Sequence, residues 1–289
     1  MEIIWDIYCF IGILILLFPS ISKTYLMAKL NEPFDFEGKL GGLSAYKMEG
    51  VKKTILRTPA GPSSKDIKTK DSYDITRRNN SEFGGCSTAG KYTRNCFHLL
   101  KPVFNFNPTW SINSLMHSIK PLDTVSEFGK RNVLISRAAY LLEGYNFNLR
   151  NPFETMVRNP PEATIERSTL SASVQFPALI PQVNFFPPGP HSYFRIVAVL
   201  AVLPDLFHKG EGYAPEGEFS FYPERVESEW LIVKAGSEPI QLDLQLPSAP
   251  SFNSYSLVLS VGIEMGAAGK GGAIETIKHT GCGKILATA

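Results

Sequence analysis

Acidic and aromatic side chains are interspersed between Asp205 and Trp230, and here the residue types come closest to a reaction or a binding site. Seven carboxylates and six aromatic rings occur in this stretch. Paired carboxylates hydrolyse glycosidic bonds when they face each other, and aromatic rings stack on sugars. The sequence supplies the acidic groups but not their geometry, and most of them lie in loops, where solvated charge is normal. With the aromatic rings, the stretch is a candidate carbohydrate-binding or peptide-binding surface. Tyr213, Tyr222 and Trp230 are the residues expected to contact such a ligand.

Other groupings that carry chemistry elsewhere do not have the required spacing here. The run 266–272 is rich in glycine, but a phosphate-binding loop needs Ser or Thr after its Gly-Lys pair, and Gly271 stands there. Cys86, Cys96 and His98 are too unevenly spaced for a zinc site. The chain also lacks a Gly-x-Ser-x-Gly nucleophile motif. The sequence therefore predicts a protein without a catalytic residue, a cofactor or a metal.

Positive charge is concentrated in the amino-terminal third of the chain. Between residues 39 and 101 there are 13 Lys and Arg against 5 Asp and Glu, whereas from residue 102 onward there are 14 against 17. Such a block attracts an acidic protein, a polyanion or a membrane surface, although a solvated surface has the same composition. No helix-turn-helix, zinc module or stacked aromatic accompanies it, which argues against nucleic acid. The residues expected to contact a partner are Lys47, Lys52, Lys53, Arg57, Arg77 and Arg78.

Residues 1–26 form an apolar leader that has two interpretations. Residues 3–18 are almost wholly apolar, which suits a short membrane anchor or the core of a signal peptide. Glu2 and Asp6 stand where a signal peptide carries positive charge, so the other interpretation is a misassigned start, with translation beginning at Met27. The first predicts an exported or membrane-anchored protein, and the second a cytoplasmic one. A chain that begins at Met27 is expected to fold.

The elements predicted before residue 125 are one hairpin and two helical segments. Residues 38–58 alternate in hydrophobicity around Glu49-Gly50, which is typical of a hairpin. Residues 64–100 show weak helical periodicity, and we expect Gly84-Gly85 to divide it. A cleaner apolar stripe predicts a short helix over residues 109–120.

Strand-like alternation dominates the rest of the chain. Residues 240–246 place four aliphatic side chains on one side and three polar ones on the other, the period of a half-buried antiparallel strand. Residues 193–203 are apolar on both faces, which predicts a central strand covered on both sides. We therefore expect a mainly β protein, with an antiparallel β-sandwich, Ig-like or jelly-roll-like, over residues 126–289 and a small α+β part over residues 27–125. The other expected strands are 132–135, 145–149, 164–167, 172–176, 229–233, 255–263, 273–278 and 284–287.

Five phrases of the sequence belong together: residues 38–47, 77–85, 126–132, 141–144 and 283–287. They resemble a family of uncharacterised bacterial proteins that have a glycine-hairpin amino terminus and a β-rich remainder. The resemblance covers Ala28 to the end, and it implies no activity, cofactor or catalytic residue.

The sequence is rich in strands and loops and has no group of residues with catalytic spacing. We therefore expect a non-enzymatic structural or protein-interaction protein, for example an assembly subunit. The expected partner is another protein or a second copy of the chain. A membrane partner is expected only if residues 3–18 are part of the protein. The alternative is a carbohydrate-binding or peptide-binding β-sandwich module that uses the loops of residues 205–230.

Overall fold

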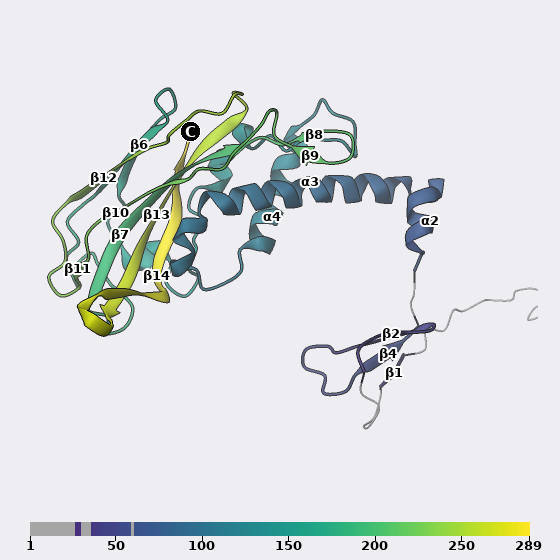
Figure 1. The fold of residues 1–289 in the computed structure, drawn as a ribbon, viewed down its shortest axis with the longest axis horizontal. Helices are drawn as coiled ribbons and strands as arrows, with labels where there is room; N and C mark the ends of the chain where they lie inside the picture. The colour runs from purple at the N-terminus through teal and green to yellow at the C-terminus, as the bar shows by residue number, and fades with distance from the viewer. Residues whose placement is uncertain (1–26, 30–35, 59–60) are drawn as a thin grey trace, which may run out of the picture. The chain divides into compact units, whose positions relative to one another are not determined.

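The computed structural model describes residues 27–29, 36–58 and 61–289, and the chain divides into two compact units, Met1–Lys70 and Asp71–Ala289 (Figure 1). The predicted leader, 1–26, lies outside the described residues. The expected boundary near residue 126 falls within the second unit, because the helices before it pack on the strands after it. Within the part of the chain that the structure describes, no helix is long and apolar enough to cross a membrane.

The first unit contains a small antiparallel sheet with the strand order β1-β4-β3-β2. A hairpin joins β2 and β3 through Gly41, whose φ of +56° favours glycine. β3 pairs with β4 as well, but residues 47–54 connect them as a loop, so the ladder around Glu49-Gly50 is shorter than predicted. The amide of Val51 donates to the carbonyl of Met48, which closes a turn without extending the ladder. The elements are β1 (Met27–Lys29), β2 (Gly38–Leu40), β3 (Leu43–Tyr46), β4 (Ile55–Arg57) and α2 (Ser64–Thr69).

The second unit is built on antiparallel sheets, and the strand-rich architecture predicted from the sequence is confirmed. A five-stranded sheet has the order β10-β7-β13-β14, with β11 paired to β7, and a three-stranded sheet has the order β12-β6-β5. A short pair joins β8 and β9. The strands are β5 (Glu162–Glu166), β6 (Ser171–Phe176), β7 (Tyr193–Pro204), β8 (Phe207–His208), β9 (Tyr213–Ala214), β10 (Glu224–Glu227), β11 (Leu231–Ile232), β12 (Ile240–Gln245), β13 (Tyr255–Ala268) and β14 (Ile274–Thr288).

β13 and β14 are longer than the alternation predicts. The two strands expected over 273–278 and 284–287 are parts of one strand, β14. The glycine-rich run 266–272 begins inside the ladder, because Gly266 pairs with Thr276. A side chain at Gly266 is excluded because its Cβ would lie 2.6 Å from the Trp230 ring. Glycine at this position therefore serves packing rather than a turn.

Successive residues of β7 point to opposite sides of the five-stranded sheet, and both sides are buried. Ile196 and Leu200 face a core that the sheet shares with the three-stranded sheet, whose contributions include Val174 and Leu244. β13 adds Leu259 and its neighbours on the same side. One apolar core therefore lies between the two sheets, as expected for a strand that is apolar on both faces.

The other side of the five-stranded sheet is covered by helices. Val197 and Val199 of β7 share a second core with Phe97, Leu100 and Ile112. Figure 1 shows α3 as the long helix that crosses this side of the unit. The helix predicted over 109–120 is confirmed as α4. The helical elements are η1 (Asp71–Tyr73), α3 (Asp74–Cys96), η2 (His98–Val103), α4 (Thr109–Ile119), η3 (Lys120–Leu122), η4 (Ile135–Arg137), η5 (Ala139–Leu142), α5 (Phe153–Met156) and η6 (Lys270–Gly272).

α3 runs through Gly84-Gly85 without a break, contrary to the sequence prediction. A Cβ at Gly85 would lie 2.7 Å from the ring of Tyr213, whereas nothing lies within 4 Å of one at Gly84. Gly85 is thus required by the close approach of β9 to the helix and not by a change of direction. The glycine pair that predicted the end of a helix therefore reflects close packing of α3 against Tyr213.

The segments expected as strands over 132–135 and 145–149 form only single bridges, Val133 to Leu206 and Asn146 to Lys284. Between them lie the 3₁₀ turns η4 and η5. Their buried residues recur at steps of three and four along the chain, which is the spacing of a helical face rather than of a strand. These residues are Ile135, Ala138, Ala139 and Leu142.

The two neighbouring glycines of α3 should respond to alanine in opposite directions. Gly84→Ala should raise the free energy of unfolding by roughly 0.5 to 1 kcal/mol, because alanine is the better residue in a helix and the site is open. Gly85→Ala should lower it by about 1 to 3 kcal/mol through overpacking against Tyr213. Chemical denaturation of both variants measures the two changes. Equal effects of the two substitutions would contradict this packing of α3.

Candidate interaction surfaces

The six basic residues predicted to bind a partner are divided between the two units. Lys47, Lys52, Lys53 and Arg57 are exposed in the first unit. The guanidinium of Arg57 lies 5.1 Å from the centre of the Tyr46 ring. The two remaining residues, Arg77 and Arg78, belong to α3 in the second unit. The structure therefore does not show these six basic residues as a single cluster.

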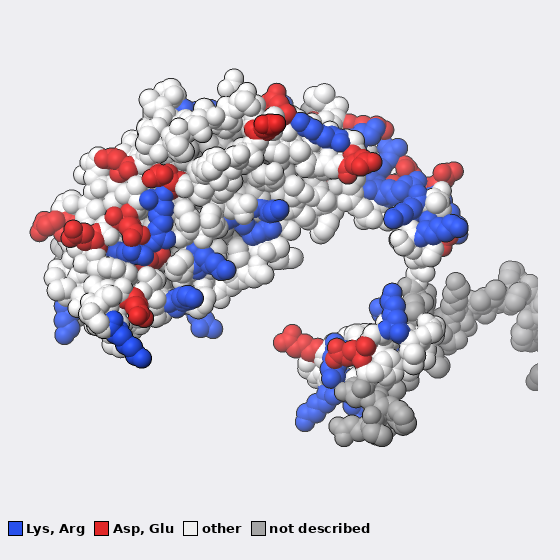
Figure 2. All heavy atoms as spheres, viewed as in Figure 1, with Lys and Arg blue, Asp and Glu red and all other residues white. Residues whose placement is uncertain are grey.

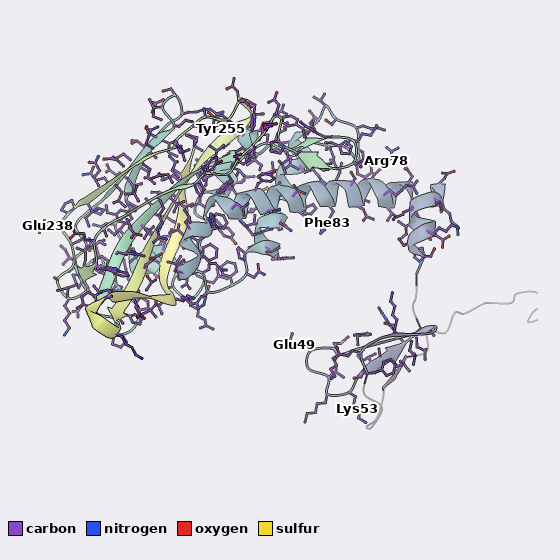
Figure 3. All side chains as sticks on the ribbon, viewed as in Figure 1. Glu49, Lys53, Arg78, Phe83, Glu238 and Tyr255 are labelled. Atoms are coloured by element: carbon purple, nitrogen blue, oxygen red, sulfur yellow. The ribbon has the colours of Figure 1, made fainter. Side chains whose placement is uncertain are left out.

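Acidic side chains surround the two arginines of α3. Arg78 contacts Asp74 at 2.7 Å and Glu127 at 3.3 Å. Arg77 lies 3.4 Å from the same Asp74. Blue and red side chains are accordingly mixed around this end of α3 in Figure 2, and Figure 3 labels Arg78 there. Such exposed pairs weaken the positive field on which the predicted polyanion site depends.

The three aromatic residues predicted to bind a ligand lie in different surroundings. Tyr213 packs against α3 at Gly85 and lies 5.2 Å, centre to centre, from the ring of His208. Trp230 lies under the guanidinium of Arg195 at 4.6 Å. Tyr222 alone is widely exposed, and it lines a hollow of about 350 Å³. The predicted ligand surface is therefore reduced to Tyr222 and the neighbours that share its hollow.

Two buried carboxylates, Glu82 and Glu264, form ion pairs that join neighbouring elements of the second unit. Glu82 of α3 is fully buried and accepts hydrogen bonds from Arg131 at 2.7 Å, the ammonium of Lys120 at 2.8 Å and the amide of Gly129 at 2.8 Å. Burial alone would raise the pKa of Glu82, but these donors lower it to about 2. Glu82 is therefore a structural anion at neutral pH.

Glu264 of β13 is the second buried carboxylate. Arg195 donates to it at 2.9 and 2.7 Å, and Arg225 donates at 3.2 Å. Arg225 also donates to the carbonyl of Leu99 at 2.6 Å, so the network ties β10 and β13 to η2. Two arginines aligned on one carboxylate fix neighbouring elements, which is how buried ion pairs act in many folds.

The described cysteines, Cys86, Cys96 and Cys282, are buried in the core. Burial raises the pKa of Cys86 to about 11 and raises the pKa of the other two thiols further. Among the residues that the structure describes, no group of three or more His, Cys, Asp or Glu side chains could hold a metal ion. A buried thiol with a raised pKa is a packing group rather than a nucleophile.

Two widely exposed aromatic side chains border a groove between α3 and α4. Trp110 is 82% exposed and Phe83 is 58% exposed, although both belong to well-formed helices. The Phe83 ring lies 5.3 Å from the imidazole of His117. We call this the aromatic groove; it has a volume of about 460 Å³. Its lining consists of Phe83, Asn107, Thr109, Trp110, Asn113, Ser114 and His117.

The aromatic groove carries no formal charge at neutral pH. Its lining contains no Lys, Arg, Asp or Glu. Burial and the nearby Lys120 lower the pKa of His117, which favours the neutral imidazole. Asn113 is held in place because its Oδ1 accepts from Arg94 at 2.9 Å, and only glycine at position 90 leaves room for it. An uncharged, preorganised groove loses little hydration energy when a partner covers it.

The sequence contains a signal for this groove that the apolar stripe of the helix concealed. Trp110, Asn113, Ser114 and His117 follow the steps i, i+3, i+4 and i+7 and form a second stripe on α4. Trp110 is the informative residue of this second stripe, because it forms an exposed apolar patch together with Phe83, and a patch marks an interaction site where a single exposed residue does not.

Comparisons of the chain with protein-family models, with curated proteins and with solved structures give no match.

Glu82→Gln should lower the free energy of unfolding at pH 7 by about 3 to 5 kcal/mol, because it leaves Arg131 and Lys120 without their buried anion. Since the folded pKa is lowered from the ordinary 4.5 to about 2, the carboxylate stabilises the fold above pH 4.5. That contribution is lost as the pH falls toward about 2. Denaturation at pH 7 and at about pH 3 tests this, with exposed Glu127→Gln as the control. A difference between wild type and Glu82→Gln that is the same at both pH values would refute it.

Proposed function

We propose that this protein is a non-enzymatic structural or protein-interaction protein, an assembly subunit, that binds another protein through the aromatic groove. The observation that carries the proposal is Trp110, which is 82% exposed on the formed helix α4 beside exposed Phe83. Tryptophan and other aromatic residues are enriched where proteins meet, and they supply much of the binding energy there. Exposed aromatics beside amide and hydroxyl groups match such an interface.

The composition of the groove favours a protein partner over a charged one. Nucleic acid and anionic membrane surfaces are bound through Lys and Arg, and none lines the groove. The basic residues 47, 52, 53 and 57 belong to the first unit, where an acidic partner is a separate proposal.

The non-enzymatic character is proposed from the way in which the chemical groups are engaged. Glu82 and Glu264 are buried in ion pairs, and Asp205 accepts hydrogen bonds from the amide and hydroxyl of Ser136 at 2.8 and 2.5 Å. Groups tied in this way stabilise folds, whereas a general acid or base needs access to its substrate. The architecture that we propose for this role is a β-sandwich of the two sheets that enclose the first core, with the helices as an added layer.

Trp110→Ala should abolish capture of the partner by a tagged form of the protein in extracts of cells that make it. The reason is that the substitution removes the largest exposed apolar surface of the groove. Tyr140→Ala is the matched control, because Tyr140 is an aromatic residue that is 64% exposed on η5 and does not line the groove. Quantitative mass spectrometry of the captured proteins makes the comparison. If Trp110→Ala and wild type capture the same proteins in the same amounts, the proposal fails.

A second candidate function is binding of a carbohydrate or a peptide at the hollow beside Tyr222. Phe219 and Tyr222 supply aromatic faces, Glu218 supplies a carboxylate, and Ser248 and Ser251 supply hydroxyls. Sugars are bound by this combination of a stacking ring and hydrogen-bonding groups. The hollow is the part of the 205–230 loops that could act in this way.

Tyr222→Ala should remove the glycan-array signals of the wild type, because the variant loses the exposed ring of the hollow. Trp230→Ala would not be a clean test, because Trp230 packs on Arg195 and Gly266. The same signals from wild type and Tyr222→Ala, or no signals from wild type, would exclude glycan binding at this hollow.

A further inference from the structure

A second hollow adjoins the aromatic groove and shares Asn107 with it. It has a volume of about 500 Å³, and we call it the basic hollow. Neither the aromatic groove nor the basic hollow has an Asp or a Glu in its lining. The lining of the basic hollow includes Lys101, Phe104, Asn105, Phe106, Asn107 and His279.

The polar side chains of the basic hollow offer hydrogen-bond donors. The Oδ1 of Asn105 accepts from the Leu149 amide at 2.9 Å, and the Oδ1 of Asn107 accepts from the Thr109 amide at 3.0 Å. A backbone amide can only donate, so these contacts occupy the side-chain oxygens and leave each NH₂ group as a donor for a ligand. Lys101 is exposed, and its ammonium has no partner among the residues that the structure describes.

His279 reaches the basic hollow from an irregularity in β14. The ladder between β13 and β14 shifts register after Ile263, and residues 278–281 bulge out of it opposite Glu264. The φ of His279 is +67°, a conformation that costs a residue with a side chain free energy. Its Nδ1 contacts the carbonyl of Phe104, which holds the imidazole at the hollow. Bulges and strained residues are concentrated where a side chain is aimed at a ligand.

The buried side chain of Asn148 fixes the bulge. Its NH₂ group donates to the carbonyl of Gly281 at 2.7 Å and to that of Val103 at 3.1 Å, which joins the bulge to η2. Two sides of the basic hollow are thereby held together before any ligand arrives. A preorganised site loses little free energy in ordering its own groups when it binds.

The segments that supply the two hollows carry only positive charge. Residues 83–122, which contain the second half of α3 together with η2 and α4, have four Lys and Arg and no Asp or Glu. Residues 276–289 of β14 have two Lys and no Asp or Glu. A carboxylate in the basic hollow therefore meets a positive field as well as the unpaired ammonium of Lys101.

We infer that the protein partner bound in the aromatic groove presents an acidic side chain, Asp or Glu, to the basic hollow. Lys101 pairs with that carboxylate, and the NH₂ groups of Asn105 and Asn107 donate to it. The inference rests on the proposed function and gives the chemistry of the partner. It is a segment with an apolar side chain against Trp110 and Phe83 and with a carboxylate a few residues away.

Selection of random peptides on the full chain tests this chemistry. The peptides that bind should be enriched in Asp or Glu within a few residues of a large apolar residue. One such peptide, made synthetically, should bind the wild type with a Kd below about 1 mM, measured by calorimetry. Trp110→Ala should weaken that binding at least about tenfold, which shows that the peptide occupies the aromatic groove.

Charge reversal at Lys101 is the decisive step. Lys101→Glu should weaken binding of the selected peptide at least about tenfold, because two carboxylates would then face each other. The same peptide with its acidic residue replaced by Lys should bind Lys101→Glu more tightly than it binds the wild type. Direct contact between the two side chains predicts this reversal, whereas an indirect effect of the substitution does not.

Lys234→Glu is the matched control, because it makes the same change of charge at an exposed residue outside both hollows. It should bind the original peptide as the wild type does. Circular dichroism of the variants shows that each is folded.

His279→Gly tests the bulge separately. Glycine adopts a positive φ freely, so the variant should denature at the same midpoint as the wild type or at a higher one. Binding of the selected peptide should still fall at least about threefold, because the imidazole is lost from the hollow. Unchanged binding by this variant contradicts the site described here.

The outcomes separate this inference from the proposed function. Selected peptides without Asp or Glu, equal binding by wild type and Lys101→Glu, or failure of the reversal each overturn the inference. If Trp110→Ala still weakens binding in these cases, the groove binds a partner and only the acidic contact is wrong. If neither Trp110→Ala nor Lys101→Glu weakens binding of any selected peptide, both proposals fail. Selection that yields no peptide with a Kd below about 1 mM overturns the inference, and the capture experiment with Trp110→Ala then decides the proposed function.

Discussion

The fold depends on the burial of both faces of β7 and β13. Every second side chain of β7 faces one core, and the residues between them face another. Neither core can be closed by the five-stranded sheet alone, since each face must be removed from water by a separate layer. The three-stranded sheet covers one face and the helices cover the other. The ion pairs of Glu82 and Glu264 reinforce the helical side, where small residues such as Gly262 let Leu100 approach the sheet.

The covering of each sheet face by a separate layer explains where exposed apolar residues occur. α4 buries Ile112, Met116 and Ile119, and its opposite stripe is left for the groove. Phe185 is buried at the base of the loop that precedes β7, while Ile180 and Val183 of the same loop are exposed. In both places a core residue holds the backbone while adjacent side chains face solvent. Rigid exposed surfaces are therefore a product of the same packing that closes the two cores.

The alternation of residues 240–246 predicted the half-buried strand β12, and the continuous apolar run 193–203 predicted that β7 is covered on both faces. The strands predicted over 132–135 and 145–149 are wrong, because each segment forms only a single bridge. The helix at residues 109–119 followed from its stripe. Gly85 was misread because a glycine demanded by a neighbouring ring looks the same in sequence as a glycine that ends a helix. The basic residues were grouped by their proximity in sequence, yet they lie in two units. The groove residues of α4 form a second stripe, which a search for core-facing residues does not detect, and the part that Phe83 of α3 contributes is visible only in the structure.

The order of the strands has a consequence for synthesis of the chain. β7 pairs with β10, β11 and β13, and β13 pairs with β14, so every partner of the central strand is made after it. α3 and α4 leave the ribosome before any strand of the five-stranded sheet exists. Both cores include side chains of β13, so neither core is complete until that strand has been made. We expect the apolar faces of α3, α4 and β7 to be incompletely covered until that stage of synthesis.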